Sequence, residues 1–492
     1  MIQGTGSDVG KSLMVAGLCR LFNRRGMAVM PFKPQNMSNN AAAVQGGEIG
    51  RAQALQARAA RVTATVDMNP ILLKPQAGGV SQLVVQGRVS SLAPQGVRGQ
   101  DYGFLKPRLL PAVMESWQRI CSAAELVLVE GAGSPAEVNL RAGDLANMGF
   151  AEAADLPVVM VGDIDRGGVI ASLVGTYQLL PLAERLRIKA YIINRFRGDV
   201  RLFDNAIPII GHHTGWPSVG IVPWFDPAQN LPAEDSLSLL TPRNSHVKDG
   251  GRIRIIVPVL PHGANLDDLD PLRAEPRVEL ILVPSGQPLP SQAELVILTG
   301  SKSTLADLAS LRAEGWDIDI QSLIRHGTRV LGLCGGYQML GQGLSDSGGL
   351  EGGGAAPGLG LLAVDTILSA TKTVRPVKGI AGGVFGQSSV SGYEIHLGQT
   401  SGADCARALL PGLSRDYPPS AGAVCDSGLV FGTYLHGIFG DDEFRKEFLR
   451  QISPEFTSSL KYELSVEQTL DGLADHLETH LDIAAILRIA GG

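Results

Sequence analysis

The sequence predicts an α/β protein built from two doubly wound, mostly parallel sheets, one in each half of the chain. First, short apolar runs end in small or polar residues and alternate with segments of helical periodicity, as strands and helices do in such sheets. Second, this pattern stops near residue 224 and restarts at Arg252. Third, the 492 residues exceed what one hydrophobic core usually holds, so at least two domains are expected.

Composition excludes several function classes. The net charge is −6 with no long basic run, so neither nucleic acid nor an anionic membrane is an expected partner. No apolar run reaches the length of about 18 residues that a membrane span needs, and no signal peptide opens the chain, so a soluble, cytoplasmic protein is expected. The five cysteines are scattered without CxxC spacing, which argues against a disulfide framework or a zinc site.

The first candidate site is the glycine-rich segment Gln3-Gly-Thr-Gly-Ser-Asp-Val-Gly-Lys-Ser12, which lies between a short strand and a helical pattern. Such a turn presents backbone N–H groups and the positive end of a helix to phosphate. Lys11 is expected to reach the outer phosphates, and the Ser12 hydroxyl is expected to bind Mg²⁺. The alternative is an ordinary glycine-rich turn, which Gly-Lys-Ser at the start of an amphipathic helix disfavours.

A second magnesium ligand is expected at the end of another strand. Residues 125–129 contain an apolar run typical of a strand buried on both faces, and Glu130 follows directly. Because an unpaired buried carboxylate is costly, a cation is expected beside Glu130. The alternative is a carboxylate that only caps a helix or closes a turn.

Further elements of the first half are expected around these two segments. Strands are predicted over 28–34, 157–162, 190–193 and 220–223, and helices over 48–61 and 104–123. The polar segment 35–40 follows a strand end, where open α/β sheets bind ligands, so it either contacts substrate or phosphate or simply forms a turn. A turn over 67–75 carries Lys74, which either meets an anion or is a solvated surface charge.

The second candidate site is Cys334, which follows the apolar segment 328–333. A strand that runs into a sharp glycine-flanked turn and then a helix exposes the sulfur, and the helix N-terminus favours the thiolate. The backbone N–H of Gly335, with a second donor from Gly300, is expected to stabilise an oxyanion. His436, at the end of a later strand, is the expected base. The alternative is a buried structural cysteine.

Two more segments of the second half carry expectations. The glycine-rich tract 345–360 is expected to form a flexible surface loop. Residues 392–398, Gly-Tyr-Glu-Ile-His-Leu-Gly, either line the active cleft or form a strand with alternating polar residues. Strands are also predicted over 252–260, 279–283 and 294–298.

The phosphate-binding segment has the form Gly-Thr-x-x-x-Val-Gly-Lys, which resembles dethiobiotin synthetase and its ATP-dependent relatives. The resemblance implies a P-loop nucleotide-binding fold and an adenine contact from an asparagine at the end of the 190–193 strand. The nucleotide-binding residues that it implies are Thr5, Asp8, Val9, Gly10, Lys11, Ser12 and Asn194.

The segment Gly-Leu-Cys334-Gly-Gly-Tyr-Gln, together with His436, resembles the triad-type, or class I, glutamine amidotransferase domain, which frees ammonia from glutamine. Most members of that family carry a glutamate two residues after the histidine, where this chain has Ile438. In lacking this glutamate the chain resembles the subgroup of cobyrinic and cobyric acid synthases, which use the cysteine and histidine without it. Members of that subgroup also place an ATP domain first. It leaves open what orients His436.

Four further segments resemble the cobyric acid synthase branch: 32–40, 129–135, 163–168 and 194–199. The resemblance implies ATP and Mg²⁺ as cofactors, with glutamine and the corrinoid adenosylcobyrinic acid a,c-diamide as substrates. The b, d, e and g carboxylates of the corrinoid would become amides in cobalamin biosynthesis. The implied division is an ATP-dependent amidoligase domain (1–235), a linker (236–251), a glutaminase domain (252–445) and a helical tail (446–492). An oligomer is compatible with this organisation.

Three alternatives remain beside this interpretation. A cobyrinic acid a,c-diamide synthase acts one step earlier, and the polar segment 35–40 favours the later step. A partitioning-type ATPase switch usually carries a second lysine early in the loop, where this chain has Gly6, and would leave Cys334 unused. A non-catalytic binding protein with degenerate sites is the third alternative.

Overall fold

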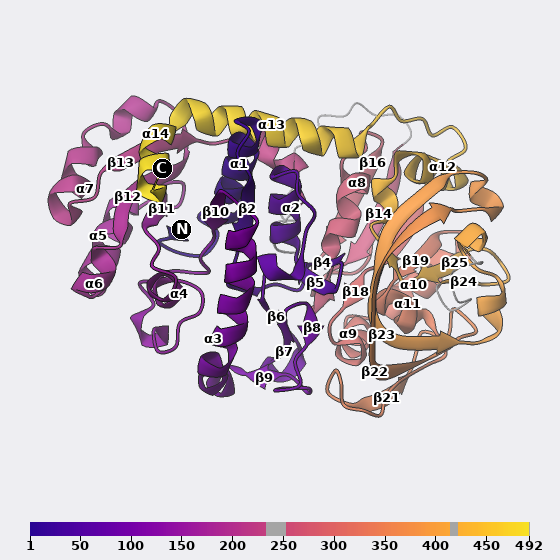
Figure 1. The fold of residues 1–492 in the computed structure, drawn as a ribbon. Coiled ribbons are helices and arrows are strands. Elements are labelled where there is room, and N and C mark those ends of the chain that lie inside the picture. The colour runs from indigo at the N-terminus through magenta and orange to yellow at the C-terminus, as the bar shows by residue number, and fades with distance from the viewer. Residues whose placement is uncertain (233–251, 414–421, 492) are drawn as a thin grey trace.

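The computed structural model describes residues 1–232, 252–413 and 422–491. Residues 1–232, the first half, lie beside residues 252–461, the second half, and a long C-terminal helix runs along one side of the molecule from the second half across the first (Figure 1). The predicted linker 236–251 lies outside the described residues. Within the described part of the chain, no helix is long and apolar enough to cross a membrane.

A parallel sheet forms the centre of the first half, as predicted. Strand β1 (Ile2–Gly4) pairs with β11 (Val158–Asp163), and the sheet continues through β12 (Ile188–Phe196) to β13 (Ser218–Pro223). On the other side of β1, a parallel bridge between Ile2 and Glu130 leads to β10 (Leu126–Val129), which pairs with β2 (Val29–Phe32). The resulting order is β2-β10-β1-β11-β12-β13, so the carboxyl ends of these strands meet at one edge, where such sheets bind ligands.

Helices cover both faces of this sheet, as alternate residues of β11 show. Val159 and Val161 belong to the same buried cluster as α1, whereas Val158 and Met160 pack with α4 and α5. The helices of the first half are α1 (Lys11–Arg24), α2 (Arg51–Ala59), α3 (Gly99–Ser122), α4 (Met148–Ala153), α5 (Val169–Leu179), α6 (Leu182–Arg185) and α7 (Ala206–Thr214). The prediction of a helix over 48–61 was wrong at its start, because Gly47–Gly50 forms strand β5 against β4 (Ala41–Val44).

A small second sheet in the first half was missed. Its strands are β3 (Gln35–Met37), β6 (Ile71–Pro75), β7 (Val80–Val85), β8 (Arg88–Val89) and β9 (Val97–Arg98). The predicted loop 35–40 and turn 67–75 are therefore partly strands. Lys74 in β6 is fully buried and paired with Glu48, so the solvated alternative for this lysine was wrong. Three of them, β3, β8 and β9, are too short for alternation to be recognised in the sequence.

The second half is built on a sheet in the order β16-β14-β17-β19-β25-β24. Its described strands pair in parallel except for the edge strand β24, which runs antiparallel to β25. The strands are β14 (Ile253–Pro258), β16 (Val278–Val283), β17 (Leu295–Leu298), β19 (Arg329–Leu333), β24 (Gly422–Val424) and β25 (Val430–Thr433). The associated helices are α8 (Asp270–Arg273), α9 (Thr304–Ala313), α10 (Trp316–Arg325) and α11 (Gly335–Leu340). The predicted fold class of two doubly wound, mostly parallel sheets is confirmed.

A separate sheet of the second half contains the long hairpin β22 (Asp365–Ile380) and β23 (Ser389–Ser401), with β20 (Gly343–Asp346), β21 (Gly354–Pro357) and β26 (Leu435–His436). The tract 345–360, expected to be a flexible loop, instead contains the end of β20 and all of β21, which pair as a hairpin. Asp346 organises it by accepting backbone N–H bonds from Leu350, Glu351 and Gly353. Residues 392–398 lie within β23, which passes beside the first half.

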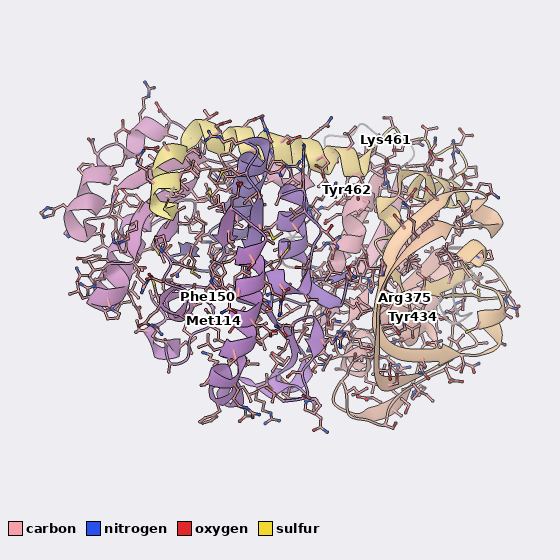
Figure 2. All side chains as sticks on the ribbon, viewed as in Figure 1. Met114, Phe150, Arg375, Tyr434, Lys461 and Tyr462 are labelled. Atoms are coloured by element: carbon pink, nitrogen blue, oxygen red, sulfur yellow. The ribbon has the colours of Figure 1, made fainter. Side chains whose placement is uncertain are left out.

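The chain ends in α12 (Asp442–Ile452), α13 (Tyr462–His480) and α14 (Ile483–Ala490). Tyr462, labelled in Figure 2, marks the point where the chain leaves the second half. From there α13 packs against α1, and Leu473 and Leu477 approach so closely that a Cβ on Gly17 would lie 2.5 Å from Leu477 Cδ1. Arg20 pairs with Glu467 at the same contact. Helices α13 and α14 thus belong to the core of the first half, whereas α12 packs into the core of the second half.

Candidate active sites

The phosphate-binding segment forms the turn between β1 and α1. Gly10 precedes α1 with φ 93°, a left-handed conformation that glycine adopts readily. At the other end, a Cβ on Gly4 would lie 2.5 Å from Val9 Cγ2, so only glycine fits. The N–H of Thr5 donates to Val161 O of β11 (3.0 Å), which connects the turn to the neighbouring strand. The resulting turn places the start of α1 at the carboxyl edge of the sheet.

The Lys11 ammonium lies across this turn. It donates to Gly6 O (2.8 Å) within the turn and to Gly133 O (3.0 Å) in the segment that follows β10. The side chain is buried, with an exposed fraction of 7%. These contacts fix a positive charge where the loop N–H groups and the helix N-terminus also favour an anion.

Ser12 and Glu130 meet beside Lys11. Ser12 Oγ donates to Glu130 Oε1 (2.6 Å), and Lys33 Nζ donates to the same oxygen (2.7 Å), while Gln56 Nε2 donates to Oε2 (2.5 Å). Lys33 is therefore the cation that the burial of Glu130 requires. Mg²⁺ prefers oxygen ligands, and here a hydroxyl oxygen and a carboxylate oxygen lie side by side, so these residues fit that ion. The described residues hold no cluster of three or more His, Cys, Asp or Glu side chains suited to a metal.

Asn194 and Asp8 lie on the β12 side of the loop. Asn194 Nδ2 donates to Val9 O (2.8 Å), and the amide nitrogen would lie 2.3 Å from a Cβ on Gly10. Asp8 has φ 56° and lies 3.4 Å from Arg166. The structure thus brings all the predicted nucleotide-binding residues to one edge of the sheet.

Cys334 occupies a strained turn between β19 and α11. Its backbone has φ 50° and ψ −106°, a conformation rarely adopted outside glycine. Gly335 begins the helix, and a Cβ there would lie 2.7 Å from Ser301 N, so the turn requires glycine. The thiol is 9% exposed, and its Sγ lies 3.7 Å from Ile395 O of β23. This geometry is typical of a nucleophile elbow.

His436 lies beside Cys334 and is held by Asp268. Asp268 Oδ2 is 2.6 Å from His436 Nδ1, and its other oxygen accepts the N–H of Gly437 (2.6 Å). Burial lowers the pKa of His436, but the charge and hydrogen bond of Asp268, with smaller effects of Cys334, raise it to about 10. The other ring nitrogen, Nε2, is buried and forms no hydrogen bond of ordinary geometry with the described residues. A Cβ on Gly300 would lie 3.4 Å from His436 Cε1, so the backbone of Gly300 lies close to the imidazole ring.

Comparison with known proteins matches each half of the chain to a family. Residues 1–239 match the family described as the CobQ/CobB/MinD/ParA nucleotide binding domain, and residues 254–444 match the CobB/CobQ-like glutamine amidotransferase domain. A Rhizobium johnstonii protein named cobyric acid synthase is 55% identical, over 98% of this chain and 96% of its own length. Proteins of the same name from Rhodobacter capsulatus and Paracoccus denitrificans are 54% identical, over 100% of this chain and 99% of theirs.

The chain belongs to the cobyric acid synthase family. Among solved structures, PurLQS from Thermotoga maritima aligns with 44% of this chain and 97% of its own, at 18% identity and a TM-score of 0.28.

The sequence analysis of this member of the cobyric acid synthase family missed two site residues, Lys33 beside Glu130 and Asp268 beside His436. Asp268 is the one that bears on the chemistry of the thiol site. It lies in the 3₁₀ turn Leu266–Leu269, which follows Asn265 in the left-handed conformation. It answers what orients His436 in the absence of a glutamate at position 438. A signal was present in the sequence, because the acidic run Asp267-Asp268-Leu-Asp270 follows the first strand of the second half. Nothing local distinguished Asp268 from its acidic neighbours.

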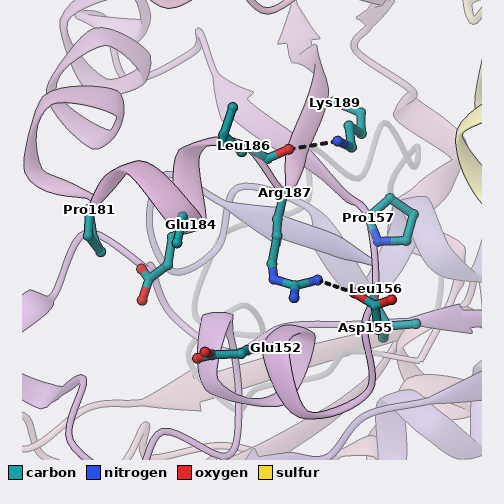
Figure 3. Close-up of a pocket in the computed structure, with 10 residues that line it drawn as sticks. Glu152, Asp155, Leu156, Pro157, Pro181, Glu184, Leu186, Arg187 and Lys189 are labelled. Atoms are coloured by element: carbon teal, nitrogen blue, oxygen red, sulfur yellow. Dashed lines mark hydrogen bonds and ion pairs between the residues drawn. The ribbon is translucent and has the colours of Figure 1, made fainter.

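One hollow of the first half lies away from both sites. Figure 3 shows a pocket of about 570 Å³ at the amino-terminal ends of β11 and β12, where Arg187 pairs with Asp155 (2.9 Å). Lys189 donates to Leu186 O there (2.7 Å). The phosphate loop lies at the opposite edge of the same sheet, so none of the predicted site residues lines this pocket.

Proposed function

We propose that this protein uses ATP and glutamine to convert the b, d, e and g carboxylates of adenosylcobyrinic acid a,c-diamide into amides. The observation that carries the proposal is the presence, in one chain, of a cysteine–histidine–aspartate arrangement and a phosphate loop with an oxygen-lined cation position. The relatives named cobyric acid synthase support the corrinoid as the substrate class. Because ATP and glutamine are cytoplasmic metabolites, we place this step of cobalamin biosynthesis in the cytoplasm.

The first site activates the carboxylate. A carboxylate does not react with ammonia at neutral pH, because its oxygen is a poor leaving group, and phosphorylation by ATP replaces that group with phosphate. Lys11 and the loop N–H groups bind the phosphates and stabilise the charge that develops during transfer. Mg²⁺ held by Ser12 and Glu130 would neutralise further phosphate charge. Lys33 and Gln56 keep the Glu130 carboxylate in place.

The second site supplies the nitrogen. His436 Nε2 takes the thiol proton of Cys334, Sγ attacks the side-chain amide carbon of glutamine, and the carbonyl oxygen becomes an oxyanion near the N–H of Gly335. His436 Nε2 gives a proton to the departing nitrogen, which leaves as ammonia, and water then hydrolyses the glutamyl thioester. Asp268 accepts a hydrogen bond from His436 Nδ1–H, which fixes the ring orientation and stabilises the imidazolium. Ammonia formed in this way attacks the acyl phosphate at the first site.

Mass spectrometry of the corrinoid tests the proposal. Incubation of the protein with adenosylcobyrinic acid a,c-diamide, ATP, Mg²⁺ and glutamine is expected to convert four carboxyl groups to amides. Omission of ATP is the control, because acyl phosphate formation then stops. An unchanged corrinoid in the complete mixture would contradict the proposal.

The same assay separates the nearest alternative. A cobyrinic acid a,c-diamide synthase would instead amidate cobyrinic acid at two positions and leave the diamide unchanged. The partitioning-ATPase alternative gives ATP hydrolysis without any corrinoid product. A non-catalytic binding protein with degenerate sites would hydrolyse neither ATP nor glutamine.

A further inference from the structure

A narrow pocket opens beside Cys334, and charged side chains of both signs line it. Its open volume is about 20 Å³, which is room for about one water molecule. Two cations, Lys302 and Lys372, and one carboxylate, Glu351, contribute to its wall. Free glutamine carries one negative and one positive charge at its α-carbon, so a pocket with both signs beside a nucleophile suits such a zwitterion.

Lys302 is the cation without a direct partner in this pocket. It follows Ser301 in the loop that leads into α9, and it is half-buried. Within the described residues its ammonium makes no hydrogen bond or ion pair. Its charge nevertheless acts to lower the pKa of the Glu48 and Glu351 carboxyl groups. A partly buried ammonium without a partner is costly and attracts an anion into its surroundings.

Lys372 is held by the other half of the chain. Its ammonium pairs with Glu48 of β5 and donates to Gln82 of β7 (3.2 Å), while Lys74 occupies the second oxygen of Glu48 (2.5 Å). Burial lowers the pKa of Lys372, whereas the nearby charges of Glu48 and Cys334 favour its protonated form. Residues of the first half therefore determine where this cation lies in the pocket of the second half.

The contact between the halves closes the pocket from a second direction as well. Gln76, which follows β6, donates to the backbone oxygens of Lys302 (3.3 Å) and Leu350 (3.4 Å). The next N–H, of Ala77, donates to Ser303 Oγ (2.9 Å). The wall of the pocket beside Cys334 is thus complete only when the two halves are in contact.

We propose that Lys302 and Lys372 bind the α-carboxylate of glutamine, that Glu351 binds its α-ammonium group, and that Glu48 of the first half positions Lys372 for this purpose. The inference rests on the proposed function, since it assigns the binding determinants of the same glutaminase site. Because the pocket holds little open volume, the long lysine side chains move aside to admit glutamine and then contact its carboxylate. A corrinoid is far too large for this space.

The decisive experiment compares full-length variants in glutamine hydrolysis. Lys302→Met and Lys372→Met keep the chain length of the side chain and remove its charge, and Lys378→Met, an exposed position on the same strand β22, is the matched control. Loss of one charge-assisted contact is expected to raise the KM for glutamine roughly 10- to 100-fold with little change in kcat. The control is expected to keep the KM of the wild type.

A specificity readout separates binding from folding defects. The preference for L-glutamine over its α-methyl ester, which lacks the carboxylate charge, is expected to fall in Lys302→Met and to be largely kept in Lys302→Arg. Amidation supported by ammonia is expected to stay at the wild-type level in Lys302→Met. An unchanged KM and an unchanged preference for L-glutamine in both methionine variants would overturn the carboxylate assignment.

Glu48→Gln tests the role of the first half. The substitution leaves Lys74 and Lys372 without their shared anion, so their repulsion displaces Lys372, and the KM for glutamine is expected to rise although Glu48 lies outside the glutaminase domain. An unchanged KM would overturn the positioning role.

If the variants keep the KM of a wild-type protein that amidates the corrinoid, this inference fails alone. If the wild type amidates no corrinoid with either nitrogen source, the proposed function fails, and glutamine hydrolysis still tests the pocket.

Discussion

The phosphate-binding site and the thiol site differ in how much of the chain each one needs. The first draws most of its groups from one continuous turn, residues 3–12, and adds Glu130 from a neighbouring strand end. The second combines Cys334, Asp268 and His436 from three separate segments. Local backbone geometry therefore builds one site, and tertiary packing builds the other.

The buried charges at the two sites follow the same division. Glu130 is compensated by Lys33, and both residues belong to the first half. Lys372, in the wall of the thiol pocket, is compensated by Glu48 across the contact between the halves. The contacts of the phosphate site thus stay within one half, whereas those of the glutamine pocket depend on both. Substitutions should separate the two sites accordingly.

The largest effect is expected for Cys334→Ala. Without the nucleophile, glutamine hydrolysis and glutamine-supported amidation should fall by roughly 10⁶-fold, to background. Ammonia-supported amidation should persist, because the phosphate site keeps all its contacts. Amide formation measured with each nitrogen source checks this separation. Equal loss with both sources would show that the two sites do not divide the chemistry.

Asp268→Asn should reduce glutamine hydrolysis by about 10²- to 10⁴-fold, because the imidazole then loses its tautomer control and the charge that stabilises its protonated form. The measurement is kcat for glutamine hydrolysis, with ammonia-supported amidation as the internal control. Asp426→Asn, at a side chain 92% exposed, is the matched substitution and should have no effect. Wild-type kcat in Asp268→Asn would exclude the aspartate from the mechanism.

Lys11→Ala should lower amidation by about 10²- to 10³-fold with glutamine and with ammonia alike, because the charge of the transferring phosphoryl group loses its partner. Glutamine hydrolysis, measured without corrinoid, should remain. This pattern is the reverse of that expected for Cys334→Ala. A variant that retained ammonia-supported amidation would place the phosphate site elsewhere.

Leu477→Ala should destabilise the first half by about 2–5 kcal/mol, because the side chain is 1% exposed and packs tightly against Gly17 of α1. Thermal unfolding with and without ATP measures the effect on the nucleotide site. Glu478→Ala, which removes an exposed ion pair with Arg25, is the control and should cost no more than about 1 kcal/mol. Equal effects of the two substitutions would argue against a role for this packing.

The smallest effect is expected from pH. The pKa of His436 is raised from 6.5 to about 10, so its protonated form stabilises the folded protein in full below pH 6.5, and this stabilisation is lost as the pH rises through 10. The difference in melting temperature between the wild type and Asp268→Asn should therefore shrink over that range. A constant difference would assign the stabilisation to the Gly437 N–H bond instead.

Much of both sites could be predicted because short, continuous segments of the sequence determine their backbone geometry. Gly4, Gly10 and Gly335 stand where a Cβ would clash or the conformation is left-handed, and such glycines are recognisable in a sequence. Glu130 and His436 could be placed because each follows an apolar run that reads as a strand. Their partners Lys33 and Asp268 could not be predicted, because each pairing joins residues far apart in the sequence that meet only in the folded protein.

The small sheet of the first half could not be predicted for a different reason. Strands such as β3 and β8 hold too few residues to show a period, and their pairing depends on the packing of their neighbours. The ion pair between Lys74 and Glu48 depends on that sheet. A sequence shows two charged residues there, and only the fold shows that water is excluded from both.

The position of α13 has a consequence for the order in which the protein matures. The core around α1 includes Leu470, Leu477 and Ile486, which a ribosome adds only after the whole second half has been synthesised. A nascent chain that stops earlier therefore leaves the apolar side of α1 uncovered. The nucleotide-binding half is completed last although its phosphate loop is translated first, so its core is fully packed only after α13 and α14 have been added.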